Sequence, residues 1–255
     1  MRVKQQRNLS NDSNCWSGGM RAERYDIESN RAFYRATLLR VLEKAPALAG
    51  QGLDLGCGTG FSTEGVLEAA PRVTWTGVDR SREMIELARR RPLLARVDLR
   101  EACAEALPFA DASFDVVVAN FSWHWFGKAA GLEVRRVLRP GGWLLASVPL
   151  RRLSHMAGNR ALARALFAGR GHFARSLSQG LRFEDIPNLL PGGVRVARHD
   201  LVVVTERFAD GQSLLSVLES RGALAAIFGD HPPATIDAPS PVDFEWPFAV
   251  LHAQV

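Results

Sequence analysis

The stretch Leu53-Asp54-Leu55-Gly56-Cys57-Gly58-Thr59-Gly60 constrains this chain more than any other. A short apolar approach, residues 47–55, leads into it, and an amphipathic run, residues 61–70, follows it. This context predicts a strand, a glycine turn and a helix. Glycines at alternate positions allow a tight turn and let the backbone come close to a ligand, because any Cβ there would collide with it. The turn therefore supplies four candidate ligand-binding residues: Asp54, Gly56, Gly58 and Gly60.

A second acidic residue stands at the spacing that a nucleoside-binding site requires. Asp79 follows Gly60 by 19 residues and ends another apolar run, residues 73–78. An acidic side chain about 20 positions on, at the tip of the second strand, suits the hydroxyls of a ribose. The alternative is an ordinary glycine-rich loop in an α/β fold, with Asp54 serving only to form the turn.

The first half of the chain alternates between expected strands and helices. The expected strands cover residues 47–55, 73–79, 96–102, 116–119 and 143–148, and the helices cover about 30–44, 61–70, 82–91 and 128–138. Ser29 or Asn30 is expected to cap the first helix, and Ser81 the third. This alternation predicts an α/β fold with a mostly parallel sheet flanked by helices.

The second half is less regular. It is expected to hold helices broken by glycines over residues 151–190, a strand over 194–205, a helix over 212–221 capped by Asp210, and a last strand over 248–253. Residues 151–190 and 206–243 are candidates for a cap over the sheet edge. We expect a mobile arm over residues 1–28, in which Trp16 and Tyr25 can pack over a ligand, and a single domain over 29–255.

Composition narrows the choice of partners. The net charge is +5 and the pI is about 9.6, and lysine occurs only at Lys4, Lys44 and Lys128, so the basic residues are almost all arginine. No nucleic-acid-binding module accompanies this charge, so we expect no nucleic-acid partner. Three widely spaced cysteines form neither a metal pattern nor a disulfide framework, which favours a reducing cytoplasm. No secretory signal and no membrane span are expected.

The glycine spacing carries a family resemblance. The order G-x-G-x-G, with Asp54 two residues before it, resembles motif I of the class I S-adenosylmethionine (SAM) methyltransferases and departs from the G-x-G-x-x-G of dinucleotide enzymes. Residues 105–115, with EALPF and then SFD, and residues 136–142, RVLRPGG, are similar to two further stretches of that family. The likeness spans about residues 50–148. It implies a Rossmann-like methyltransferase fold and SAM as cofactor.

The resemblance also implies roles for individual residues. Asp54 would receive the cationic methionine end of SAM, Asp79 the ribose, and Ser81 or Met84 would cover the adenine. The family usually has an acidic residue, which contacts the adenine amino group, where this chain has Cys103. The Ala104 N–H can still bind the adenine ring. The implied cofactor set is Asp54, Gly56, Gly58, Gly60, Asp79, Cys103, Ala104 and Asn120.

The stretch Asn120-Phe121-Ser122-Trp123-His124-Trp125-Phe126 follows the fourth expected strand. It lies where ligands bind in parallel sheets. His124 is either a general base for a hydroxyl or amine acceptor or a structural histidine beside the cofactor. Trp123 and Trp125 either line a substrate pocket or pack in the core. No metal site is expected.

This stretch is similar to that of the malonyl-acyl-carrier-protein O-methyltransferases of biotin synthesis. The resemblance implies a carboxylate acceptor, which is ionised at neutral pH and needs no base. Arg151, just past the fifth strand, would hold that carboxylate, unless it is simply part of a solvated basic surface. An acidic carrier protein would suit the arginine-rich cap.

Three functions remain open at this point. The first is an O-methyltransferase for a small-molecule or carrier-bound acceptor. The second is a secondary-metabolite methyltransferase that acts on oxygen, nitrogen or carbon with His124 as base. The third is a SAM-binding assembly factor without catalysis, which Cys103 keeps open. The sequence determines neither the acceptor nor the oligomeric state.

Overall fold

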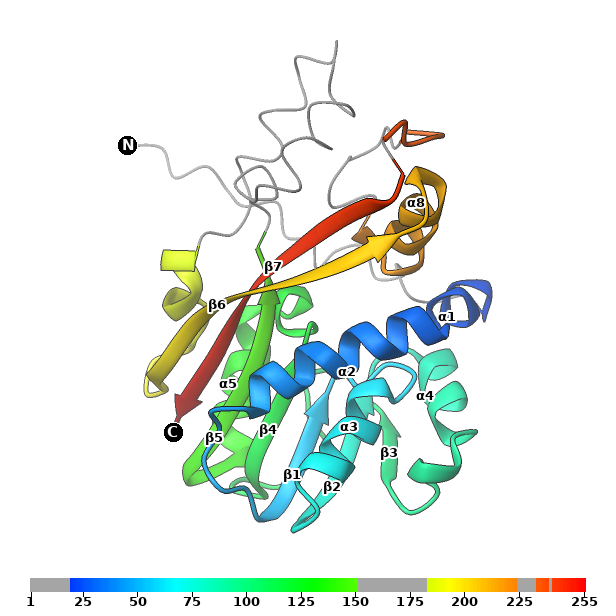
Figure 1. Cartoon of the computed structure of the whole chain (residues 1–255). Coiled ribbons are helices and arrows are strands. Elements are labelled where there is room, and N and C mark those ends of the chain that lie inside the picture. Colours follow the sequence, from blue (N-terminus) through cyan, green and yellow to red (C-terminus); the bar gives the residue numbers. More distant parts are fainter. Residues whose placement is uncertain (1–18, 151–182, 224–232, 239) are drawn as a thin grey trace.

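A seven-stranded sheet forms the centre of the molecule. The computed structural model describes residues 19–150, 183–223, 233–238 and 240–255. The strands lie in the order β3-β2-β1-β4-β5-β7-β6 (Figure 1). The first five run parallel to their neighbours, whereas β7 is antiparallel to both β5 and β6. Their bounds are β1 Gly50–Leu55, β2 Val73–Asp79, β3 Asp98–Glu101, β4 Phe114–Asn120, β5 Leu138–Pro149, β6 Arg195–Phe208 and β7 Val242–Gln254.

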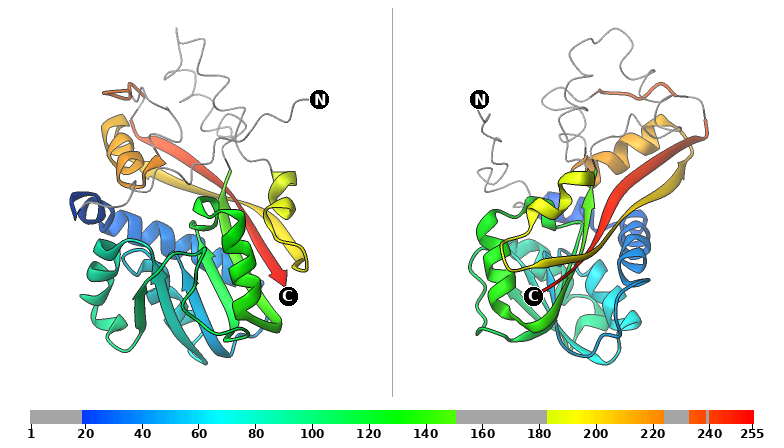
Figure 2. Two further views of the ribbon diagram at one scale, coloured as in Figure 1. Left: turned by 180° about the vertical axis from the view of Figure 1, so that it is seen from behind. Right: turned by 90° about the vertical axis from the view of Figure 1, so that its left-hand side faces the viewer.

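Helices cover both faces of this sheet. Figures 1 and 2 show α2 and α3 on one face and α5 on the other. The helices are α1 Gly19–Tyr25, α2 Glu28–Leu42, α3 Phe61–Ala69, α4 Arg82–Arg89, α5 Lys128–Val137 and α8 Gly211–Ser220, with 3-10 turns η2 Pro92–Leu94, η3 Trp123–Trp125 and η5 Phe183–Leu189. The α/β class that the alternating pattern predicts is therefore confirmed. Among the described helices, none has the length and apolar character needed to cross a bilayer.

Strand β4 shows why the sheet is covered on both faces. Val117 and Ala119 pack in the cluster that includes Val134 and Val137 of α5. Val116 and Val118 pack in a second cluster, with side chains from α2 and α3. Successive side chains of a strand point to opposite faces, so an uninterrupted apolar strand needs cover on each.

The chain reverses its direction across the sheet between β1 and β4. After β1 it adds β2 and β3 on one side, and then returns to place β4 and β5 on the other. Because these five strands are parallel, their carboxyl ends meet at one edge. A reversal of strand order leaves a crevice at that edge, where α/β proteins bind ligands. The glycine turn follows β1, and the residue 120–126 stretch follows β4, so both lie at that edge.

Two helix caps confirm the sequence prediction. The Ser81 hydroxyl accepts a hydrogen bond from the Met84 N–H at 3.3 Å, at the start of α4. The Asp210 carboxylate accepts one from the Ser213 N–H at 2.7 Å, at the start of α8. These caps were predictable because they involve only neighbours in sequence.

Other expectations were wrong at the N-terminal side. Residues 19–25 form α1 rather than part of a mobile arm, and α2 begins at Glu28 without a side-chain cap. Asn30 is fully buried, and its amide donates to the Tyr25 carbonyl at 2.8 Å instead of capping the helix. Trp16 lies outside the described residues.

The C-terminal half also differs from the expectation. β7 begins at Val242 rather than at residue 248, because its first residues pair with the far end of β6, up to Phe208. Part of the expected cap over residues 206–243 is therefore the end of the β-hairpin that β6 and β7 form. Helix α8 lies between these two strands in the sequence, not in the sheet. The helices expected within residues 151–182 lie outside the described residues.

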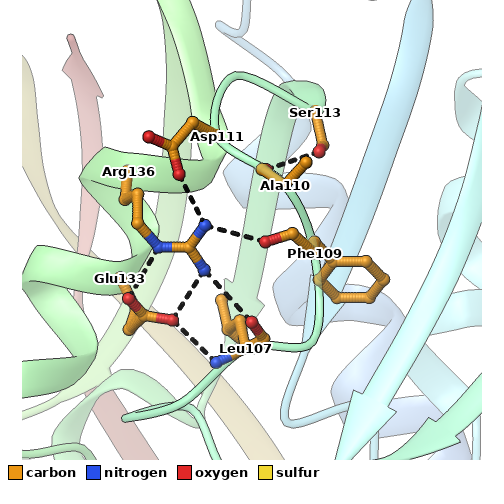
Figure 3. A network of polar contacts seen from close by, with 7 residues as sticks. All are labelled: Leu107, Phe109, Ala110, Asp111, Ser113, Glu133 and Arg136. Carbon is orange, nitrogen blue, oxygen red and sulfur yellow. Dashed lines mark hydrogen bonds and ion pairs between the residues drawn. The ribbon is translucent and has the colours of Figure 1, made fainter.

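Arg136 fastens the loop after β3 to α5 (Figure 3). Its guanidinium donates to the Leu107 carbonyl at 3.1 Å and to the Phe109 carbonyl at 2.7 Å. The same group pairs with Glu133 at 2.8 Å and with Asp111 at 2.9 Å. Glu133 in turn accepts from the Leu107 N–H at 2.7 Å. This arrangement explains physically why the EALPF stretch and the RVLRPGG stretch occur together in the chain.

We predict that Arg136→Met lowers the free energy of unfolding by about 2 kcal/mol, because several charge-assisted hydrogen bonds are lost at once. Urea denaturation followed by circular dichroism measures this loss. Arg82→Met is the matched control, since Arg82 forms only an exposed helical pair with Glu86. It should leave the unfolding midpoint unchanged. Equal midpoints for the two variants would contradict the structural role of Arg136.

Candidate functional site

The glycine turn is fixed in a shape that side chains cannot share. Gly56, Gly58 and Gly60 have φ values of +74°, +55° and +91°, which L-residues rarely adopt. A Cβ at Gly56 would lie 2.5 Å from the Ser122 side chain, and one at Gly60 would lie 2.4 Å from Leu94. A Cβ at Gly58 would meet only the ring of Tyr25, at 3.8 Å. Gly58 is therefore the position at which the turn faces the ring of Tyr25.

Asp54 is buried at the end of β1 with half of its carboxylate unbonded. The Thr63 hydroxyl donates to Oδ2 at 2.7 Å, whereas Oδ1 is buried and has no hydrogen-bond partner among the residues that the structure describes. Burial raises the pKa of Asp54 to about 7, and the charge of Asp79 adds to this shift while the Thr63 hydrogen bond opposes it. An unbonded buried carboxylate oxygen is costly, so it is a natural place for a cation or donor.

Asp79 stands at the end of the neighbouring strand and supports the turn. Its Oδ2 accepts from the Gly58 N–H at 3.0 Å, and its Oδ1 accepts from the Ser81 N–H at 2.8 Å. Burial raises the pKa of Asp79, although these backbone N–H groups oppose the shift. A carboxylate has about four lone-pair sites and the Arg80 N–H also bonds to Asp79, so some acceptor capacity remains for a further donor.

The loop after β3 carries two more of the predicted cofactor residues. Cys103 is exposed, and its carbonyl accepts from the Ala106 N–H at 3.1 Å. Ala104 is only 6% exposed and packs in the core cluster on the α5 side of the sheet. Strand pairing continues into this loop, because the Ala102 N–H donates to the Asp79 carbonyl at 3.0 Å. The loop thus lies beside Asp79, and Arg136 holds it there.

Asn120 corrects a sequence prediction. Its amide nitrogen donates to the Tyr34 carbonyl at 2.9 Å and to the Ser62 hydroxyl at 3.0 Å. Its amide oxygen accepts from the Ser147 hydroxyl at 2.7 Å and from Thr37 at 3.4 Å. Every donor and acceptor of this buried side chain is therefore used inside the protein. Asn120 joins α2, α3, β4 and β5, and its amide is not free to bind the cofactor.

The residues that follow Asn120 form a turn that packs against the end of β1. Phe121 has a φ of 53°, a left-handed conformation that is strained for a phenylalanine. The Ser122 hydroxyl donates to the Leu55 carbonyl at 2.6 Å and so ties this turn to the end of β1. No role was predicted for Ser122. The only signal in the sequence was Gly56, because a glycine can indicate that a neighbouring side chain lies close to the backbone.

The aromatic residues of this turn separate into core and site. Trp123 is 5% exposed and packs in the core, with its ring 6.0 Å from that of Phe126, which agrees with the core-packing alternative for this residue. His124 and Trp125 are partly buried, and their rings lie 4.7 Å apart. These two remain candidates for the acceptor side. Arg151 lies outside the described residues.

Arg91 and Tyr25 connect the N-terminal helices to the glycine turn. The Arg91 guanidinium donates to the Thr59 carbonyl at 2.6 Å, pairs with Asp26, and stacks on Phe61 with its carbon 4.4 Å from the ring centre. Tyr25 precedes Asp26, and its ring lies 5.8 Å from that of Phe61. The expectation that Tyr25 packs over the ligand mouth thus has a counterpart in the geometry. Arg91 was not anticipated from the sequence.

We predict that Asp54 makes the stability of the ligand-free protein depend on pH. Its pKa of about 7 when folded exceeds the value of about 3.9 expected in an unfolded chain, so the folded state holds its proton more tightly. The free energy of unfolding should therefore fall as the pH rises from about 4 to 7. Asp54→Asn keeps an acceptor for Thr63 and should remove this part of the fall. Urea denaturation at pH 5.5 and 8 tests it; identical pH dependence in both proteins would contradict the assignment.

Three comparisons with known proteins agree with this site. Residues 53–146 match the family model described as "Methyltransferase domain". The chain is 33% identical over 156 residues to phthiotriol/phenolphthiotriol dimycocerosates methyltransferase 1 of Mycobacterium ulcerans, covering 52% of this chain and 58% of that protein. It is 35% identical over 115 residues to a fatty-acid O-methyltransferase of Mycolicibacterium smegmatis, covering 44% and 42%.

The fold has counterparts among solved structures. A SAM-dependent methyltransferase from Aquifex aeolicus aligns with a TM-score of 0.59 at 15% identity, over 93% of this chain and 99% of that one. The chain spans about half the length of the two curated relatives. The glycine turn, the acidic strand ends and these matches agree in one respect: residues 53–146 are similar to a methyltransferase domain.

Proposed function

We propose that this protein transfers the methyl group of SAM to a small-molecule acceptor at the carboxyl edge of its parallel sheet. The observation that carries the proposal is the buried oxygen of Asp54 that has no hydrogen-bond partner among the described residues; it stands beside a glycine turn in which Gly58 has space around its α-carbon, with only Tyr25 near it. The second acidic strand end, Asp79, supplies the remaining polar contact that a nucleoside needs.

The residues present fit SAM. The Asp54 carboxylate would pair with the ammonium of the methionine part, which satisfies its unbonded oxygen. Asp79 would accept from the ribose hydroxyls with the acceptor capacity that the backbone N–H groups leave unused. Bound SAM supplies a methyl group on a positively charged sulfur. The ring of Tyr25, which faces Gly58, would cover the cofactor from the N-terminal side.

Beyond binding SAM, the protein then has two tasks: to position the reacting groups and to exclude water. A methyl transfer requires the acceptor atom, the methyl carbon and the sulfur to be aligned, and water to be excluded. The turn after β4, with His124 and Trp125, and the N-terminal cover, with Tyr25, would enclose the reacting groups on opposite sides. Asn120 and Ser122 would hold that turn in place through the bonds described above.

We favour a carboxylate as the acceptor group. One of the two curated relatives is by name a fatty-acid O-methyltransferase, which acts on this class of acceptor. A carboxylate is ionised at neutral pH, so this reaction requires no base. A malonyl group on an acyl carrier protein belongs to the same class. The segment 151–182 contains seven arginines and no acidic residue, a composition that suits an anionic acceptor or an acidic carrier.

The rival proposal is a hydroxyl or amine acceptor with His124 as base. It is favoured by the position of His124, which follows β4 at the ligand edge and is partly buried beside Trp125. A general base would have to lie within hydrogen-bond reach of the acceptor proton. The two proposals therefore differ in what removal of the imidazole does.

We predict that His124→Gln keeps most of the methyl-transfer activity toward a carboxylate, with a rate at saturating SAM that stays flat from about pH 6 to 9. Transfer from radiolabelled SAM to fatty acids, malonyl carrier protein, phenols and amines measures both acceptor class and rate. A loss of about 10²-fold with unchanged SAM affinity, and a rate that rises through a histidine-like pKa, would overturn the carboxylate proposal. Trp125→Phe serves as a control for packing around the imidazole.

A further inference from the structure

Tyr25, which lies against the glycine turn, is linked to a series of buried polar contacts that leads away from the proposed cofactor site. Tyr25 ends α1, and its ring also lies 5.3 Å from that of Tyr34. Its backbone carbonyl accepts a hydrogen bond from the Asn30 amide at 2.8 Å. Asn30 does not touch the glycine turn, but it fixes the backbone of the residue that covers it.

The same Asn30 side chain also bonds to two residues of the C-terminal half. Its amide also donates to the Ser220 hydroxyl of α8 at 3.2 Å, and its oxygen accepts from the Arg221 guanidinium at 2.9 Å. These partners lie 190 and 191 residues away in sequence. A fully buried asparagine with all its bonds made can hold two distant elements in one relative position.

Arg221 anchors this chain of contacts in the C-terminal hairpin. Its guanidinium forms a two-pronged pair with Glu206 of β6, and its side chain is only 2% exposed. The guanidinium carbon lies 3.9 Å from the ring centre of Phe33 and 4.8 Å from that of Trp246. Packing between two rings and pairing with a carboxylate leave this arginine a single position.

We infer that Asn30 and Arg221 are positioning residues that hold Tyr25 over the cofactor. Contact by contact, the path runs from the glycine turn to Tyr25, Asn30, Arg221 and then Glu206 on β6. The hairpin of β6 and β7 would thereby set the closure of the cofactor cover from outside the cofactor site. The inference rests on the proposed function, since it concerns SAM bound at the glycine turn.

A double-mutant cycle on SAM binding tests this path. Asn30→Asp keeps an acceptor for Arg221 but removes the donor to the Tyr25 carbonyl. We expect Tyr25→Ala to raise the SAM dissociation constant about tenfold and Asn30→Asp about fivefold, as for the loss of one contact or one hydrogen bond. Combined, they should bind no more weakly than Tyr25→Ala alone, because Asn30 acts through Tyr25.

Arg207→Ala is the matched control, since Arg207 forms an exposed two-pronged pair with Asp243 on the same hairpin. It should leave SAM affinity unchanged. Hydrogen exchange of the ligand-free protein gives a readout independent of SAM: amides of residues 19–27 should exchange faster in Asn30→Asp than in Arg207→Ala. If Asn30→Asp fails to fold, Arg221→Lys replaces it in the test. Lysine keeps the positive charge beside Glu206 but cannot form the two-pronged contact of the guanidinium.

The outcomes separate the inference from the function on which it rests. Unchanged SAM affinity in Asn30→Asp or Arg221→Lys, or additive effects in the double variant, would overturn the positioning role while leaving the methyltransferase proposal intact. If the wild-type protein itself does not bind SAM, the proposed function fails first. Calorimetry on the wild type therefore precedes the cycle.

Discussion

The parallel pairing of β1 with both β2 and β4 is the constraint on which the site depends. It places the ends of the three strands at one edge, so that Asp54, Asp79 and Asn120 come close together although they are far apart in sequence. The strand order reverses at β1, and ligands in open α/β sheets bind at such points. Two turns then approach each other there, and Ser122 can reach the Leu55 carbonyl only because position 56 has no side chain.

This arrangement contains groups that a purely apolar interior would not tolerate. Asp54 has one unbonded buried oxygen, Phe121 holds a left-handed conformation, and Arg221 is buried beside Glu206. Removing one partner of a buried pair is usually destabilising by several kcal/mol, and strained residues persist only where their surroundings hold them.

Much of the fold could be predicted because its signals are local. The glycine turn, the alternation of strands and helices, and the caps Ser81 and Asp210 depend on residues a few positions apart. Asn30, by contrast, looked like a helix cap because asparagine favours that position. Its amide instead bonds to Ser220, and no local pattern announces a partner 190 residues away.

The site was predicted in the same uneven way. Asp54 and Asp79 lie at the strand ends, as their spacing predicts. Trp123 packs in the core, and the Asn120 side chain bonds to neighbouring elements of the protein. Only the packed structure shows which side of this turn is buried. The start of β7 was missed because Pro- and Asp-rich sequence favours a loop, while pairing with β6 extends the strand to Val242. Tertiary pairing overrides local preference here.

The central claim is that SAM binds at the glycine turn against the acidic ends of β1 and β2. Isothermal titration of SAM into the wild-type protein, Asp79→Ala and Asp98→Ala tests it most directly, since Asp98 is an exposed aspartate at the start of β3 that pairs with Arg100. The account predicts one site per chain in the wild type, unchanged affinity in Asp98→Ala, and affinity at least about tenfold weaker in Asp79→Ala. Equal affinity in Asp79→Ala and the wild type, with both proteins folded, would contradict it.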